Sequence, residues 1–152
     1  MKIVFSTKNV NRPSFLDTCR FAYDYGFSGF EIYDAIKERT THNDSILRRD
    51  HTADSKRKLI NRNLSVSALT YPVPLNSAEA DSDILVKYVD MASNSGVENL
   101  IVRIEEETSF DDLKEKLSRI LNNIKCYTDG CYAAQFETPQ SYYEKLMGAY
   151  GR

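Results

Sequence analysis

The chain has 152 residues and a mass of 17.4 kDa, with 41% hydrophobic and 28% charged residues. This length suits a single domain, and the composition excludes a disordered, collagen-like or disulfide-rich chain. A net charge of −2 provides no overall positive field to hold a polyanion, which argues against a nucleic acid partner. No stretch approaches the roughly 18 apolar residues of a membrane span, so no membrane association is expected.

The beginning of the chain and its cysteines indicate a cytoplasmic protein. One lysine and the short apolar run Ile3-Val4-Phe5 do not form a secretory signal peptide. Cys19, Cys126 and Cys131 contain no C-x-x-C pair and lack the spacing of a zinc site. We therefore expect reduced thiols and a cytoplasmic location.

The predicted elements alternate between strand and helix along the whole chain. Glycine or asparagine stops end four of the apolar helical patterns, at Gly26, Asn63, Gly96 and Gly130, which are 37, 33 and 34 positions apart. An interval of about 35 residues is the size of one βα unit. The predicted strands lie near 2–6, 28–33, 64–70, 98–103 and 131–136, and the predicted helices near 13–25, 53–62, 80–95, 109–127 and 139–148.

This alternation predicts an α/β fold with a parallel sheet, because each crossover must carry a helix over one face of the sheet. Five βα units fit a (βα)5 partial TIM barrel, whose complete form would have about 280 residues. They also fit a flavodoxin-like open sheet, the alternative that the chain length favours.

In both architectures the chemistry lies where the carboxyl ends of the strands meet the following loops. The loop at 6–12 contains no glycine, so it is neither a P-loop nor a dinucleotide-binding loop. It also lacks the acidic residues with which a receiver domain binds magnesium. The longest insertion, 34–50, is expected to be a polar loop.

Two passages resemble the sugar phosphate isomerase/epimerase family, whose fold is the xylose-isomerase-like TIM barrel. The passage at 21–32 ends in Gly26-Phe27-Ser28-Gly29-Phe30-Glu31-Ile32, similar to the Gly-aromatic-x-Gly strand of that family. The passage at 92–102, with Gly96 before a strand, is similar to the family's fourth helix and strand. The resemblance covers most of residues 1–140.

The resemblance implies a divalent metal, Mn, Zn or Mg, held by carboxylates and a histidine. It also implies that Glu137, at the end of the fifth predicted strand, is both a metal ligand and the catalytic acid/base. A carboxylate base and a Lewis acid suit the removal of a proton next to a carbonyl. The family's other ligands come from strands 6–8, so residues 1–152 are expected to form one truncated barrel domain that is incomplete or inactive as this chain.

Several polar residues in the predicted loops are candidates for binding a sugar or sugar phosphate. The substrate-binding candidates are Lys8, His42, Tyr71 and Arg103. A convergence of Lys8 and Arg103 with Arg12, Arg48 and Arg49 would recognise a phosphate. Glu31 is expected to be structural and to pair with a cation at the end of its strand.

Two functions from different classes follow. The first is a metal-dependent sugar or sugar-phosphate isomerase/epimerase. The second is a non-catalytic α/β module, derived from a barrel and used for binding or assembly. An uncovered parallel edge strand favours association, so we expect a homo-oligomer or a partner chain that completes the barrel.

Overall fold

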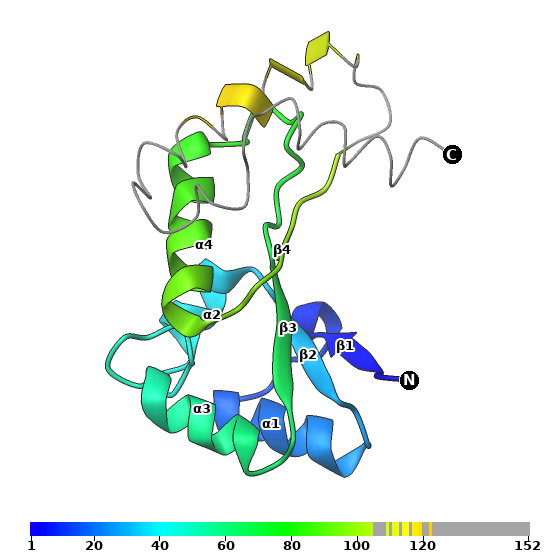
Figure 1. Cartoon of the computed structure of the whole chain (residues 1–152), viewed down its shortest axis with the longest axis vertical. Coiled ribbons are helices and arrows are strands. Elements are labelled where there is room, and N and C mark those ends of the chain that lie inside the picture. The colour runs from blue at the N-terminus through cyan, green and yellow to red at the C-terminus, as the bar shows by residue number, and fades with distance from the viewer. Residues whose placement is uncertain (105–108, 110, 113, 116, 120–121, 123–152) are drawn as a thin grey trace.

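The computed structural model describes residues 1–104, 109, 111–112, 114–115, 117–119 and 122 (Figure 1). Strands and helices alternate in the predicted order. They are β1 (Val4–Ser6), the 3₁₀-helix η1 (Thr7–Asn9), α1 (Phe15–Asp24), β2 (Gly29–Tyr33), α2 (Ala35–Thr41), α3 (Thr52–Ile60), β3 (Ser65–Thr70), α4 (Ser82–Ser95) and β4 (Leu100–Ile101). The predicted strand 131–136, the predicted helix 139–148 and Glu137 lie outside the described residues, and the predicted helix 109–127 is described only in part.

The four strands form one parallel sheet in the order β1-β2-β3-β4. A flavodoxin-like sheet places its first strand between the second and the third, whereas here β2 lies between β1 and β3. Sequential order is that of a barrel. The predicted α/β class and the partial barrel are therefore confirmed. The described sheet does not have the strand order of the flavodoxin-like alternative.

The two faces of the sheet have different neighbours. Phe5 and Phe30 are register partners, and their rings pack against the α1 residues Phe21, at 5.2 Å, and Phe15, at 5.8 Å between centroids. Figure 1 shows α2, α3 and α4 on the same side as α1. Because side chains alternate along a strand, the next residues point to the opposite face, which we call the helix-free face because none of the α-helices α1 to α4 lies on it in the described part of the chain. Glu31 and Tyr33 of β2 lie on it.

A bulge between β2 and β3 sets which β3 residues share the helix-free face. Phe30 pairs with Val66, but Glu31 pairs with Ala68, so β3 carries one extra residue, Ser67. The Ser67 hydroxyl donates to the Phe30 carbonyl oxygen over 3.2 Å. Beyond the bulge, Thr70 lies opposite Tyr33 and so lies on the same face as Glu31.

Helices α1, α3 and α4 end at or just before the stops predicted at Gly26, Asn63 and Gly96, and a capping residue begins α1. Ser14 is the N-cap of α1, and its hydroxyl accepts a hydrogen bond from the Asp17 backbone N–H. Gly26, Asn63 and Gly96 have φ angles of 74°, 52° and 75°, the left-handed conformation in which a helix commonly ends.

The insertion at 34–50 is the main departure from the predicted elements, because it contains α2. Asp34, with φ 59°, caps this helix and accepts a hydrogen bond from the Lys37 N–H. The buried residues of α2 are Glu38, which is charged, and Ala35, whose apolar side chain is short. Hydrophobic periodicity cannot detect a seven-residue helix that buries a carboxylate.

Asp44, in the same insertion, binds the first backbone N–H groups of α1. Its two carboxylate oxygens each accept a 2.9 Å hydrogen bond, one from the Phe15 N–H and one from the Leu16 N–H, and Lys58 Nζ lies 3.5 Å away. Asp44→Asn removes one acceptor and the charge, so we expect a loss of about 1–2 kcal/mol in the free energy of unfolding at pH 7, measured by urea denaturation.

Lowering the pH should remove the contribution of Asp44 to the free energy of unfolding. Burial alone would raise the pKa of Asp44, but the backbone hydrogen bonds from Leu16 and Phe15 outweigh it and lower the pKa below 3.8. A lowered pKa stabilises the fold above the unfolded pKa, and the stabilisation is lost as the pH falls through the folded one. The difference between wild type and Asp44→Asn should therefore shrink at pH 3, while Asp24→Asn, on the exposed end of α1, changes stability by less than about 0.5 kcal/mol.

Candidate functional site

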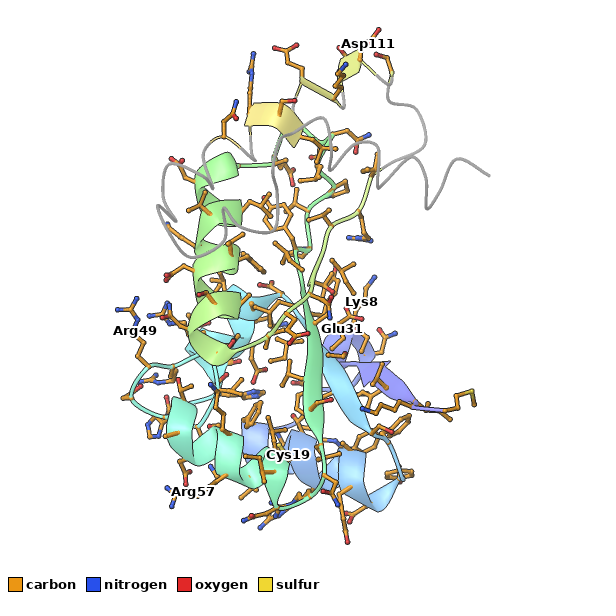
Figure 2. All side chains as sticks on the ribbon, in the orientation of Figure 1. Lys8, Cys19, Glu31, Arg49, Arg57 and Asp111 are labelled. Carbon is orange, nitrogen blue, oxygen red and sulfur yellow. The ribbon has the colours of Figure 1, made fainter. Side chains whose placement is uncertain are left out.

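The candidate site lies at the carboxyl ends of the strands, which share one edge because all four strands are parallel. Ser6, Tyr33 and Thr70 are the last residues of β1, β2 and β3. Lys8 follows in η1, and Arg103 lies two residues beyond β4. Figure 2 labels Lys8 and Glu31 at this end of β1 and β2.

Three strands meet at one carboxylate, which we call the carboxylate bridge (Ser6, Glu31 and Thr70). Glu31 Oε1 accepts a hydrogen bond from Ser6 Oγ over 3.3 Å and another from Thr70 Oγ1. Thr70 is buried, whereas Glu31 and Ser6 are half-buried. The expected pairing of Glu31 with a cation is not what the described residues show. Hydroxyl groups from the two neighbouring strands hold its carboxylate instead.

Beside the bridge, two cations gather at one aromatic ring, in a group that we call the cation–tyrosine cluster (Lys8, Tyr33 and Arg103). Lys8 Nζ lies 5.1 Å from the centroid of the Tyr33 ring, and Arg103 Cζ lies 6.0 Å from it. Arg103 Nη2 also donates to the Tyr33 hydroxyl over 3.3 Å and to the Pro72 carbonyl oxygen over 2.6 Å. The structure therefore brings together two of the four predicted substrate-binding residues.

His42, the third of them, is buried elsewhere. Its Nδ1 lies 2.8 Å from Glu38 Oε2, and its Nε2 lies 2.8 Å from the carbonyl oxygen of Arg12. Burial alone would lower the pKa of His42, but the Glu38 carboxylate outweighs it and raises the pKa above 6.5. Desolvation raises the pKa of Glu38, although His42 opposes that shift. The pair connects the end of α2 to the segment before α1.

Tyr71, the fourth, packs into the core. Its side chain is 2% exposed, and its ring meets that of Tyr88 edge-on, at 5.3 Å between centroids. The Tyr71 hydroxyl accepts a hydrogen bond from the backbone N–H of Asp81, the N-cap of α4, over 3.2 Å. Tyr71 therefore positions the start of α4.

The other predicted cations do not join the cluster. Arg12 stacks on Phe21, with its guanidinium carbon 4.3 Å from the ring centroid. Arg48 pairs with Asp50 at 3.3 Å, and Arg49 pairs with Asp90 at 3.6 Å. Figure 2 shows Arg49 on the far side of the molecule from Lys8.

The residues that the structure describes do not supply a metal site by themselves. No group of three His, Cys, Asp or Glu side chains with the geometry to hold a metal ion occurs among them. Glu137, the predicted ligand, lies outside this part of the chain. What the described residues can do is accept hydrogen bonds at Glu31, attract an anion at Lys8 and Arg103, and offer the face of Tyr33. In the same part of the chain, no helix is long and apolar enough to cross a membrane.

The sequence contained a signal for the carboxylate bridge. Phe30 and Ile32 are fully buried on the helix side of β2, so the polar residues between and after them, Glu31 and Tyr33, must face the other way. That alternation was visible in the sequence. The hydroxyl partners were not, because the bulge that brings Thr70 to the same face has no clear sequence pattern.

Comparison with known proteins supports the barrel. No family model and no curated protein matches the sequence. Among solved structures, 3-keto-D-glucoside 4-epimerase from E. coli is similar with a TM-score of 0.55 and 16% identity, over 85% of this chain and 53% of that one. A xylose isomerase domain protein from Alicyclobacillus acidocaldarius is similar with a TM-score of 0.51 and 14% identity, over 83% of this chain and 45% of that one.

These similarities show the fold. The described sheet and helices have the architecture of a xylose-isomerase-like barrel, as the sequence resemblance predicted. The chain spans about half the length of each of these two solved structures.

Proposed function

We propose that this chain is part of a sugar or sugar-phosphate isomerase/epimerase, and that residues 1–152 contribute one side of its barrel domain. The fold of the two similar structures supports this proposal, and both carry names of sugar-converting proteins. Support also comes from the position of the polar groups, which gather at the carboxyl ends of the strands, where barrel enzymes have their active sites.

The observation that carries the proposal is the cation–tyrosine cluster. Lys8 and Arg103 come from opposite ends of the described sheet, after β1 and β4, yet both contact the Tyr33 ring. Both side chains are exposed, so their charges are available to a ligand. Two cations beside an aromatic face suit a phosphorylated sugar, because the phosphate is attracted to the cations and the sugar packs on the ring.

We propose that Glu137 is the acid/base and a ligand of Mn, Zn or Mg, as the family resemblance implies. A carboxylate there would remove the proton next to a sugar carbonyl. The bound metal would act as a Lewis acid on the substrate oxygens. In this proposal the described residues bind and orient the substrate, while His42 and Tyr71 act indirectly, by fixing the loops around the site.

The second candidate, a non-catalytic module used in assembly, is favoured by the helix-free face. Val4 and Ile101 lie on it and are 44% and 41% exposed. β1 is the first strand of the described sheet, with no partner on its other side there. A second copy of the chain or a partner chain that completed the barrel would cover these residues.

The proposal predicts phosphate-dependent sugar binding, which isothermal titration calorimetry with a panel of ketose and aldose phosphates in the presence of Mn²⁺ can measure. Arg103→Met should raise the dissociation constant about 10–100-fold, because a charge-assisted contact with phosphate is lost. Lys8→Met should act in the same direction. Any Mn²⁺ dependence of the binding heat that wild type shows should be lost in Glu137→Gln.

Arg57→Met is the matched control. Arg57 is an exposed arginine of α3, and Figure 2 shows it far from Lys8. Its replacement should leave binding unchanged. Absence of binding for the whole panel, together with association in sedimentation experiments on the same sample, would replace the enzymatic proposal with the assembly module.

A further inference from the structure

Glu31 holds an unusual position among the acidic residues that the structure describes. It lies on the helix-free face of β2, flanked by β1 and β3, and its Oε1 accepts hydrogen bonds from a hydroxyl group of each neighbouring strand. Ser6 also accepts a hydrogen bond from the Lys8 backbone N–H over 3.3 Å, which orients the Ser6 hydroxyl. Hydroxyl groups on β1 and β3 therefore hold the carboxylate of this β2 side chain in place.

These contacts occupy only one side of the carboxylate. Among the described residues, neither a hydrogen bond nor an ion pair involves Glu31 Oε2. An ionised carboxylate has about four sites for hydrogen bond donors, so capacity remains after Ser6 and Thr70 have bonded. Since Glu31 is half-buried, this capacity is open to a ligand at the carboxyl ends of the strands.

We propose that Glu31 binds the hydroxyl groups of the substrate, and that it determines which end of a sugar phosphate enters this side of the site. The inference rests on the proposed function and deepens it. Sugar hydroxyls donate hydrogen bonds to a carboxylate, and such charge-assisted bonds are about twice as strong as neutral ones. Ser6 and Thr70 are positioning residues in this scheme, because they act on the substrate through Glu31.

The charged groups along β2 predict one orientation for a bound sugar phosphate. Glu31 and Tyr33 are two residues apart on one strand and one face, so they are about 7 Å apart along β2. The cations around Tyr33 attract a phosphate, whereas the Glu31 carboxylate repels it and accepts from hydroxyls. A sugar phosphate would therefore lie along β2, with its phosphate at Tyr33 and its hydroxyls at Glu31.

Glu31→Gln tests this, with inorganic phosphate as the probe for the cations and a ketose phosphate, D-ribulose 5-phosphate or D-fructose 6-phosphate, as the probe for the whole site. Calorimetry should show the dissociation constant of the sugar phosphate rising about 10–100-fold, while that of inorganic phosphate stays unchanged or falls. Arg103→Met should weaken both probes. The ratio of the two constants separates hydroxyl recognition from phosphate recognition and from a general loss of structure.

The other outcomes are distinct. If wild type binds the sugar phosphates and Glu31→Gln binds them equally well, the role of Glu31 is overturned while the proposed function stands. If wild type binds neither sugar phosphates nor inorganic phosphate, the proposed function fails, and this inference fails with it. If Glu31→Gln does not fold, as judged by circular dichroism, Thr70→Val decides. This change keeps the shape, removes the hydroxyl donor to Glu31 and should raise only the sugar phosphate constant, about 3–10-fold.

Discussion

Replacing Gly29 with alanine is expected to destabilise the protein more than the same replacement at Gly26 or Gly96, the other glycines that the structure describes. Gly29 is buried at the start of β2, between Val4 of β1 and Ser65 of β3. A Cβ atom built there would lie 2.1 Å from the backbone carbonyl oxygen of Ser65. Because the obstacle is backbone, relief requires moving β3 away from β2. We expect a loss of at least about 3 kcal/mol in the free energy of unfolding.

Urea denaturation followed by circular dichroism measures this effect, and Gly26→Ala is the matched control. Gly26 has φ 74°, but nothing lies within 4 Å of its added Cβ. Its replacement should cost only the strain of a left-handed alanine, about 1–2 kcal/mol. The two glycines of the Gly-aromatic-x-Gly passage thus have different roles. Gly26 allows a left-handed backbone conformation, and Gly29 leaves room for the backbone of β3. An alanine at 29 tolerated better than one at 26 would contradict this assignment.

Breaking the Glu38–His42 pair should have the second largest effect. Both side chains are about nine-tenths buried, with Nδ1 and Oε2 2.8 Å apart. His42→Ala leaves the Glu38 carboxylate without its imidazole partner and frees the Arg12 carbonyl oxygen, so we expect a loss of about 3 kcal/mol. Thermal and urea unfolding at pH 6 measure it. His51→Ala, which removes an exposed histidine 3.6 Å from Asp50, should cost less than about 0.5 kcal/mol.

The same pair predicts a loss of stability on the alkaline side. The pKa of His42 is raised above 6.5, because Glu38 outweighs the opposing effect of burial. The contribution of the imidazolium is therefore fully present below pH 6.5 and is lost as the pH rises through the folded pKa. The raised pKa of Glu38, caused first by desolvation, acts in the same direction above pH 4.5. The free energy of unfolding should fall more steeply from pH 6 to 9 in wild type than in the Glu38→Gln/His42→Gln double variant, and parallel profiles would contradict the assignment.

The order of elements was predictable because its signals are local. Ser14 starts a helix, and Gly26, Asn63 and Gly96 end helices, each through hydrogen bonds or φ angles that depend on a few neighbouring residues. The helix α2 was missed although its own pairing is also local. Its buried charged residue, Glu38, pairs with His42 four residues later, and a search for hydrophobic spacing does not register a buried position that carries a charge.

The candidate site was predicted in part. Loop position after parallel strands was enough to select Lys8 and Arg103, because strand direction alone brings their loops to one edge. It also selected His42 and Tyr71, whose burial depends on side-chain packing that loop position does not specify. The role of Tyr33 as the common contact of the two cations required the geometry of three separate segments.

The bulge in β3 has a consequence for how this chain can change over evolutionary time. The bulge takes up Ser67, so that Thr70 rather than Leu69 shares the face of Glu31. If the strand kept Ser67 but lost the bulge, regular alternation from Val66 would turn Leu69 toward the carboxylate and Thr70 toward the helices. Loss of Ser67 together with the bulge would leave Thr70 opposite Tyr33. Lineages that retain the hydroxyl contact to Glu31 are therefore expected to keep both Ser67 and the bulge or to lose both.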